Sequence, residues 1–242
     1  MNLSLVHLNI ERDKHYKRIE PFLREQKPDV VCMQEIFERD IPFFREVLDA
    51  ECFFVPMALN KSIHGMSPEG IAVFSRTGFT STTFHQLGGR EGDLIPYVEG
   101  TPGEKNETQR YVLALVEVPY EGKMYSIGTT HFPVTYKGEI NEIQEGVLDA
   151  FLAATDSIES CLITGDFNAP RGKEIFTKLS ENFTDNVPEH YKSSLDDNLH
   201  RAGPIPFMVD GLFSRGNHRV QNVGMQCGVS DHCALTAVVE QE

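Results

Sequence analysis

Polar residues that can bind a metal ion or a phosphate group stand at the ends of several predicted strands. Buried strands have no packing reason to carry such side chains, and ligand sites in open α/β sheets lie beyond strand ends, where side chains converge on a rigid backbone. The pattern therefore predicts one site assembled from six strands. Its candidate members are Asn9, Glu35, His131, Asp166, Asn168, Asp210, Asp231 and His232.

Two short runs define the chemistry more closely. Asp166 and Asn168 stand two positions apart after the run LITG, and in extended backbone this spacing sends both side chains to one side. A carboxylate and an amide would then face the same substrate. Each feature also has a simpler interpretation when taken alone: an Asx turn for Asp166 and Asn168, a surface pair for Asp231 and His232, and a solvated strand exit for Glu35.

Hydrophobic periodicity places these residues on alternating strands and helices. Residues 3–10 and 29–34 are short apolar runs that predict buried strands. Residues 13–26 and 41–48 carry apolar side chains at helical spacing, which predicts an amphipathic helix after each strand. Asn9 could equally cap the helix that follows it.

The rest of the chain adds strands with both hairpin and crossover connections. Gly and Pro residues crowd residues 85–109, which predicts a long loop there. The turn Tyr120-Glu121-Gly122 between two apolar runs predicts a β-hairpin. Further strands are expected at about 52–57, 70–75, 111–118, 123–130, 160–164, 207–214, 219–225 and 234–239, and further helices at 139–154 and 173–181. Mixed sheets covered by helices, an α/β sandwich, would account for this pattern.

The order of the motifs along the chain resembles the endonuclease/exonuclease/phosphatase superfamily, which shares the fold of pancreatic deoxyribonuclease. The runs PDVVCMQE, GIAVFSR, TTHF, ITGDFN and VSDH carry the resemblance, and they span nearly the whole chain. The resemblance implies a four-layer α/β sandwich, with two mixed β-sheets packed face to face and helices on the outer faces. We expect a single domain of this type over residues 1–242.

The resemblance also implies metal-assisted hydrolysis of a phosphoester. Mg²⁺ and Mn²⁺ prefer hard oxygen ligands, so Glu35 is expected to be the principal metal ligand. Asn9, Glu11 and Asp231 would contribute to the metal site directly or through water.

Six further residues would act on the phosphate group. Asp166 matches the family residue that orients or deprotonates the attacking water, and Asn168 would donate a hydrogen bond to a phosphate oxygen. His232 would be paired with Asp210, because an aspartate fixes the tautomer of an imidazole and favours its protonated form. The remaining two donors would be His131 and Arg110.

Composition narrows the class of partner. The 242 residues carry 36 acidic and 22 basic side chains, a net charge of -14 that disfavours binding to a polyanion, because DNA binding draws on Lys and Arg. The content of 40% hydrophobic and 24% charged residues is typical of a globular protein. No window reaches the roughly 18 apolar residues that a membrane span needs. We expect a soluble, cytoplasmic monomer.

The cysteines and the remaining histidines are expected to be structural. Five cysteines at irregular spacing indicate buried thiols in a reducing compartment. Cys227, His232 and Cys233 fit no zinc-binding spacing, so we expect no structural zinc. The histidines outside the family motifs, His7 and His200 among them, are expected to be core or surface residues.

The leading function is a divalent-metal-dependent phosphodiesterase or nuclease. The alternative is a phosphatase or phosphodiesterase for a small or lipid-linked phosphate, which the net charge of -14 favours over duplex nucleic acid. The run Met208-Val209-Asp210 and the absence of tryptophan depart from abasic-site endonucleases and inositol polyphosphate 5-phosphatases. A catalytically inactive binding protein of the same fold is the third hypothesis, and the intact set from Asn9 to His232 argues against it.

Overall fold

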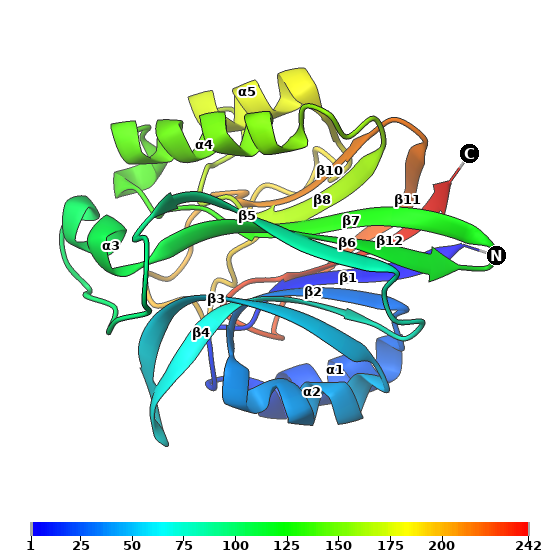
Figure 1. The fold of residues 1–242 in the computed structure, drawn as a ribbon, viewed down its shortest axis with the longest axis horizontal. Coiled ribbons are helices and arrows are strands. Elements are labelled where there is room, and N and C mark those ends of the chain that lie inside the picture. The colour runs from blue at the N-terminus through cyan, green and yellow to red at the C-terminus, as the bar shows by residue number, and fades with distance from the viewer. Residues whose placement is uncertain (1, 242) are drawn as a thin grey trace.

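Two β-sheets packed face to face form the centre of the structure, and helices cover both outer faces (Figure 1). The computed structural model describes residues 2–241. The first sheet has the strand order β11-β12-β1-β2-β4-β3 and the second has the order β5-β6-β7-β8-β10-β9. Each sheet contains parallel and antiparallel neighbours, so the expected four-layer α/β sandwich with two mixed sheets is confirmed.

The elements have the following bounds. The first sheet contains β1 (Leu3–Asn9), β2 (Val30–Phe37), β3 (Glu51–Ser62), β4 (Gly65–Ser75), β11 (His218–Gln226) and β12 (Ala234–Gln241). The second sheet contains β5 (Ser81–Gly89), β6 (Arg110–Tyr120), β7 (Lys123–His131), β8 (Cys161–Asp166), β9 (Thr184–Asp185) and β10 (Asp210–Arg215). The α-helices are α1 (Tyr16–Gln26), α2 (Ile41–Leu48), α3 (Pro102–Thr108), α4 (Glu142–Thr155) and α5 (Glu174–Asn182). None of the described helices is long and apolar enough to cross a membrane.

Three layers of apolar side chains hold the sandwich together. The middle layer lies between the sheets, where Leu5 and Val73 of the first sheet pack in one cluster with Ile127 and Leu212 of the second. Helices α1 and α2 cover the outer face of the first sheet, and α4 and α5 cover that of the second (Figure 1). Both sheets are therefore buried on both faces, which explains their nearly continuous apolar runs.

Helix α1 shows how the sequence builds an outer layer. Ile19 and Phe22 lie on one stripe at helical spacing and are buried against the first sheet. The helix begins at Tyr16, later than the expected residue 13, because the chain first turns through Glu11 and Arg12, whose φ angles are 47° and 63°. This turn places polar side chains directly after β1.

A parallel pair of strands in each sheet positions the candidate site residues. Helix α1 connects β1 to β2, and α4 connects β7 to β8. The carboxyl ends of parallel strands meet at one edge of a sheet. Accordingly, Asn9 lies opposite Gln34 in the first sheet, and His131 lies opposite Asp166 in the second.

Residues 85–109 are more regular than the expected loop. Strand β5 extends to Gly89, and helix α3 occupies Pro102–Thr108. Thr101 and Glu104 form a capping box at the start of α3, in which each side chain accepts a hydrogen bond from the other residue's backbone N–H. This local signal stabilises a short helix within a glycine-rich segment.

The cysteines differ from the expectation of five buried thiols. Cys227 and Cys233 form a disulfide, so the prediction is wrong for this pair, whereas the other three cysteines are free. The register of β11 against β12 gives the reason. Gln226, the last residue of β11, pairs with Ala234, the first residue of β12, so the adjacent residues Cys227 and Cys233 lie opposite each other just beyond the strands.

Candidate active site

His232 and Asp210 form the pair that the sequence predicts. Nδ1 of His232 lies 2.7 Å from Oδ2 of Asp210, and both side chains are buried. Burial acts to lower the pKa of His232, but the charges of Asp210 and Asp166 outweigh it and raise this pKa well above its usual value. Both carboxylates therefore favour the protonated imidazole, whose Nε2–H would be the donor to a ligand.

Asp210 has a second imidazole partner, which the sequence analysis took to be structural. Nε2 of His7 lies 2.8 Å from Oδ1 of Asp210, and the side chain of His7 is fully buried. Burial acts to raise the pKa of Asp210, but the hydrogen bonds and charges of His232 and His7 lower it below its usual value. His7 stands two positions before Asn9 on β1, and this strand alternation is the signal that could have identified it.

Asp166 lies at the end of β8 between two imidazoles. Its Oδ2 is 3.5 Å from Nε2 of His131 and 3.7 Å from Nε2 of His232, and it accepts a hydrogen bond of 3.1 Å from Nδ2 of Asn9. Its Oδ1 accepts a hydrogen bond of 2.9 Å from the backbone N–H of Asn168, so the Asx turn is present as well. With the Asp166 residue only 2% exposed, its carboxylate is held in one orientation.

Asn168 lines the cleft from a left-handed backbone position, with φ of 48°. Its Nδ2 donates a hydrogen bond of 3.0 Å to the carbonyl oxygen of Phe132, which leaves one amide proton for a ligand. Glu11, Arg12 and Glu35 also have positive φ. Such conformations cost about 1–3 kcal/mol each in non-glycine residues and are often found at functional sites.

Carboxylates gather at one point of the cleft, where predicted metal ligands come together. Glu11, His15 and Asp231 place ligand atoms within 4.8 Å of one another. Burial, together with the charges of Glu11 and Glu35, raises the pKa of Asp231 to about 6 against the opposing effect of His232. The repulsion of Asp231 by Glu11 and Glu35 favours a cation, and carboxylate oxygens are the donors that Mg²⁺ and Mn²⁺ take, so these residues fit a hard divalent ion.

A β-bulge directs Glu35 toward this group. The register of β2 against β4 shifts between Met33 and Ile36, and a bulge of this kind re-aims a side chain. Oε1 of Glu35 accepts a hydrogen bond of 3.3 Å from Nδ2 of Asn9, and Oε2 lies 3.7 Å from Nε of Arg12. The amide nitrogen of Asn9, and not its oxygen, therefore faces carboxylates from both sheets.

These side chains surround a cleft with a volume of about 160 Å³. Asn9 and Asp210 do not line the cleft themselves. Asn9 lies behind Asp166 and Asp210 lies behind His232, and each forms a hydrogen bond with that lining residue. Arg110 differs from expectation, because its Nη2 donates to the carbonyl oxygen of Gly92 and its side chain is not among the described groups that line the cleft. The predicted residues that do line the cleft are Glu11, Glu35, His131, Asp166, Asn168, Asp231 and His232.

Strand alternation explains the position of Arg110. Its neighbours Gln109 and Tyr111 face the cleft, so the side chain between them points the other way. The cations that line the cleft are instead Arg12, Lys105 and Arg201. None of these three cations stands in one of the motifs at the predicted strand ends.

Glu69 is a further lining residue that the sequence analysis did not single out. Burial and then the charge of Glu35 raise its pKa to about 8, against the opposing effects of Arg12 and of a hydrogen bond from Asn60. Glu69 immediately precedes the run GIAVFSR, which begins at Gly70. Its position next to this run is the sequence feature that could have identified Glu69 as a site residue.

Asp196 connects two loops that border the cleft. Its Oδ1 accepts hydrogen bonds of 2.9 Å from the backbone N–H groups of Asn198 and Leu199, and its Oδ2 accepts one of 2.6 Å from that of Gly228. Its own N–H donates to the carbonyl oxygen of Asp231 at 2.8 Å. One buried carboxylate therefore fixes both loops.

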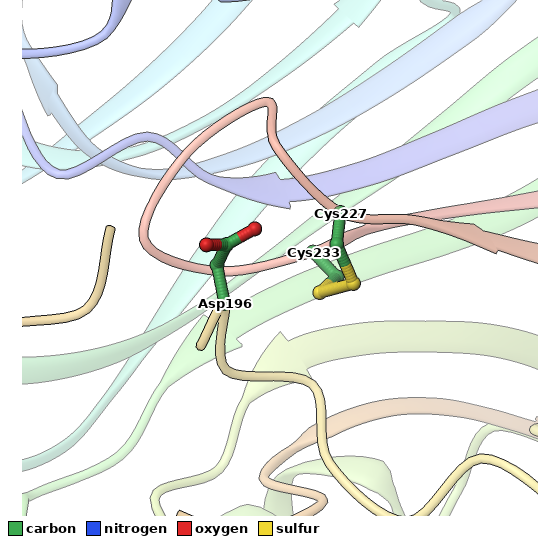
Figure 2. A group of neighbouring side chains, drawn as sticks. All are labelled: Asp196, Cys227 and Cys233. Atoms are coloured by element: carbon green, nitrogen blue, oxygen red, sulfur yellow. A yellow bond between two sulfur atoms is a disulfide. The ribbon is translucent and has the colours of Figure 1, made fainter. Parts of the chain in front are cut away.

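Figure 2 shows the carboxylate of Asp196 beside the disulfide between Cys227 and Cys233. The disulfide closes the short loop that carries His232, and its sulfur atoms, bonded to each other, are not thiolate ligands. The other loop carries His200, which lines the cleft with its ring centroid 6.4 Å from that of His232. We interpret the Asp196 group as a structural support of the site.

Fold and site together define a class of protein: a four-layer α/β sandwich whose sheets meet at a carboxylate and imidazole cluster. The sequence matches the endonuclease/exonuclease/phosphatase family over residues 6–232, and the chain belongs to this family. Its members are in general phosphoester hydrolases.

Solved structures share the fold at low sequence identity. An endonuclease/exonuclease/phosphatase from Beutenbergia cavernae DSM 12333 superposes with a TM-score of 0.77 and 16% identity, covering 99% of this chain and 72% of that one. The catalytic domain of human Nocturnin, solved with a bound sulfate anion, gives 0.69 and 15%, covering 100% and 94%. A mannosyl-6-phosphatase from Bacteroides thetaiotaomicron VPI-5482 gives 0.68 and 11%, covering 98% and 99%. A search of curated proteins finds no match to this sequence.

Proposed function

We propose that this protein is a divalent-metal-dependent phosphodiesterase. The observation that carries the proposal is one cleft in which Asp166 lies between two histidines and next to a group of carboxylates. Hydrolysis of a phosphoester needs a group that orients or deprotonates water, a cationic donor to the phosphoryl oxygens, and a metal site. The cleft contains candidates for each requirement.

Glu35, Glu11 and Asp231 would hold Mg²⁺ or Mn²⁺, and Asn9 would position Glu35 through its amide hydrogen bond. When bound, the ion would act as a Lewis acid on the phosphoryl oxygens. The partial burial of these carboxylates strengthens their interaction with any cation, because water screens them less.

The remaining residues act on the water and the phosphate. Asp166 accepts a proton from the attacking water, or orients that water, from the fixed position that Asn9 gives it. His232, which Asp210 holds in its protonated form, donates its Nε2 proton to a phosphoryl oxygen as negative charge builds. His131, the second imidazole next to Asp166, supplies another hydrogen-bond donor to the phosphate. Asn168 donates through its free amide proton.

A phosphatase or phosphodiesterase for a small phosphoester is the second candidate. The cleft volume of about 160 Å³ favours it, because pockets for drug-sized ligands usually have volumes of about 300–1,000 Å³. The mannosyl-6-phosphatase among the similar structures supports the same candidate. The net charge of -14 disfavours a nuclease that binds duplex nucleic acid.

Hydrolysis of two aryl phosphates tests the proposal. We expect turnover of bis-p-nitrophenyl phosphate with Mg²⁺ or Mn²⁺ and its loss on addition of a chelator. Faster turnover of p-nitrophenyl phosphate would favour the second candidate. No hydrolysis of either compound with either metal would contradict a phosphoester hydrolase and favour a binding protein.

A further inference from the structure

One wall of the cleft carries polar groups that the reaction described above does not use. Asn60 and Glu69 come from β3 and β4, whereas Tyr97 and Gln109 come from the segment between β5 and β6. Nδ2 of Asn60 donates to Oε2 of Glu69. Within residues 2–241, the side chains of Tyr97 and Gln109 and the amide oxygen of Asn60 make no hydrogen bond, so they are available to a ligand.

This wall is held in place by backbone hydrogen bonds. The N–H of Leu59 on β3 donates to the carbonyl oxygen of Ile95 at 3.0 Å, and the N–H of Tyr97 donates to the carbonyl oxygen of Leu59 at 2.8 Å. Nζ of Lys105 in α3 lies 2.9 Å from Oε1 of Glu99. Figure 1 shows α3 at the same end of the sandwich as the β3–β4 hairpin. The segment before α3 is therefore fixed across β3 and limits the cleft on that side.

The chemistry of the wall matches neutral hydroxyl groups. Amide and phenol side chains both donate and accept hydrogen bonds, as a sugar hydroxyl does. Two of the cations near the wall already have carboxylate partners, since Lys105 pairs with Glu99 and Nε of Arg12 lies 3.7 Å from Glu35. With these two cations paired and the deprotonated Glu99 beside them, the wall favours an uncharged group over a second phosphate.

We propose that Asn60, Glu69, Tyr97 and Gln109 bind a compact polyhydroxylated group, a monosaccharide or a polyol, that is esterified to the phosphate cleaved in the same cleft. The segment before α3 is fixed across β3 and limits the cleft beyond this wall, which favours one such group over a chain of them. The inference rests on the proposed phosphoester hydrolysis and adds the class of substrate.

Matched substrates separate recognition of the polyol from the chemistry. Glucose 6-phosphate and glycerophosphoglycerol are a monoester and a diester of polyols, and p-nitrophenyl phosphate and its bis ester are the corresponding aryl compounds. In Asn60→Leu, kcat/KM should fall about tenfold more for the polyol esters than for the aryl esters, because roughly 1.4 kcal/mol of hydrogen bonding is lost only with the polyol.

Two further variants control the measurement. Gln109→Leu, from the other element of the wall, should give the same selective loss, and it serves as the test if Asn60→Leu fails to fold. Asn182→Leu changes an exposed asparagine on α5 and should lower no kcat/KM. An equal loss on polyol and aryl esters in both wall variants would overturn the subsite while leaving the hydrolase intact.

Two results with the wild-type protein also test the polyol subsite. Preference of the wild-type protein for a single-stranded oligonucleotide over every polyol ester would overturn the subsite. If the wild type hydrolyses none of these esters, the proposed function fails, and ligand-observed NMR with glucose 6-phosphate decides the subsite separately. Binding to the wild type that weakens in Asn60→Leu would support the subsite, and equal or absent binding would overturn it.

Discussion

Glu35 stands at a β-bulge with φ of 58°. Nδ2 of Asn9 donates a hydrogen bond to its carboxylate and another to that of Asp166. Glu35→Gln keeps the shape of the side chain and removes its charge, so Mn²⁺ affinity should fall by at least about tenfold, the effect of about 1.4 kcal/mol. Titration calorimetry with Mn²⁺ measures this, and circular dichroism should show an unchanged fold. Glu38→Gln, at an exposed neighbouring position, should bind Mn²⁺ as the wild type does. Wild-type affinity in Glu35→Gln would show that the metal site lies elsewhere.

Asp166 and His232 are predicted to act on the same phosphate, since Oδ2 of Asp166 lies 3.7 Å from Nε2 of His232. Asp166→Asn and His232→Ala should each lower kcat by roughly 10²–10⁴-fold, the range for acid–base and electrostatic groups. Residues that work as a unit have non-additive effects, so the double variant should lose much less than the product of the two factors. A loss equal to the full product would count against a shared site.

The site residues that the sequence predicted are those that stand in motifs at strand ends. Asp166 and Asp210 could be predicted because each is a carboxylate at the end of an apolar strand. His7 and Glu69 carry weaker signals, which are strand alternation with Asn9 for His7 and the position before Gly70 for Glu69, and neither signal reveals the polar partner with which the side chain pairs. A partner distant in sequence leaves no local spacing to read.

Among the elements, the loop from Ser194 to Arg201 depends on Asp196. Asp196→Asn would place an amide N–H against the backbone N–H of Gly228, which now donates to Oδ2 at 2.6 Å. We expect the free energy of unfolding to fall by about 1.5–3 kcal/mol, the value of a hydrogen bond to a charged group. We also expect a lower kcat, because the backbone N–H of Asp196 donates to the carbonyl oxygen of Asp231 and so helps to position this residue. Urea unfolding and kinetics measure the two effects.

Asp149→Asn, at an exposed position on α4, is the matched control for this change. It should alter neither stability nor kcat. Wild-type stability and kcat in Asp196→Asn would show that the disulfide between Cys227 and Cys233 holds the loop without help from the carboxylate.

Element types could be predicted from the sequence wherever periodicity was strong. The apolar stripe of α4 and the apolar runs of β6 and β7 gave the right elements, and the mixed sheets followed from the crossover and hairpin connections. Helix α3 has a local start signal in Thr101 and Glu104, but its seven residues PGEKNET bury no apolar stripe and lie in a glycine-rich segment, so periodicity predicted a loop there. The disulfide required the register of β11 against β12, which only the fold determines.

At the scale of the whole molecule, the candidate site exists only because the two sheets pack together. Asn9 of the first sheet donates to Asp166 of the second, and His7 of the first pairs with Asp210 of the second. These bonds cross the middle layer of the sandwich. The orientation of the catalytic candidates is therefore coupled to global stability, and conditions that weaken sheet packing should also lower activity.

His218 provides a pH-dependent contact between the sheets. It stands at the start of β11, and its Nδ1 lies 2.7 Å from Oγ of Ser160, the residue before β8. Burial lowers its pKa to about 4, whereas an unfolded histidine titrates near 6.5. Between these values the unfolded chain binds more protons than the folded one, so stability falls as the pH is lowered from about 6.5 to about 4.

His218→Phe should remove this part of the acid sensitivity. A shift from 6.5 to about 4 corresponds to at most about 3.5 kcal/mol, at about 1.4 kcal/mol for each pH unit. The wild type loses this stability over the range, and the variant does not. Phe keeps an aromatic ring against Tyr125, whose centroid lies 5.8 Å from that of His218. Urea unfolding at several pH values between 7.5 and 4 measures the two profiles, and His190→Phe, at an exposed position, should follow the wild type. Parallel profiles for His218→Phe and the wild type would mean that the acid sensitivity comes from other buried groups.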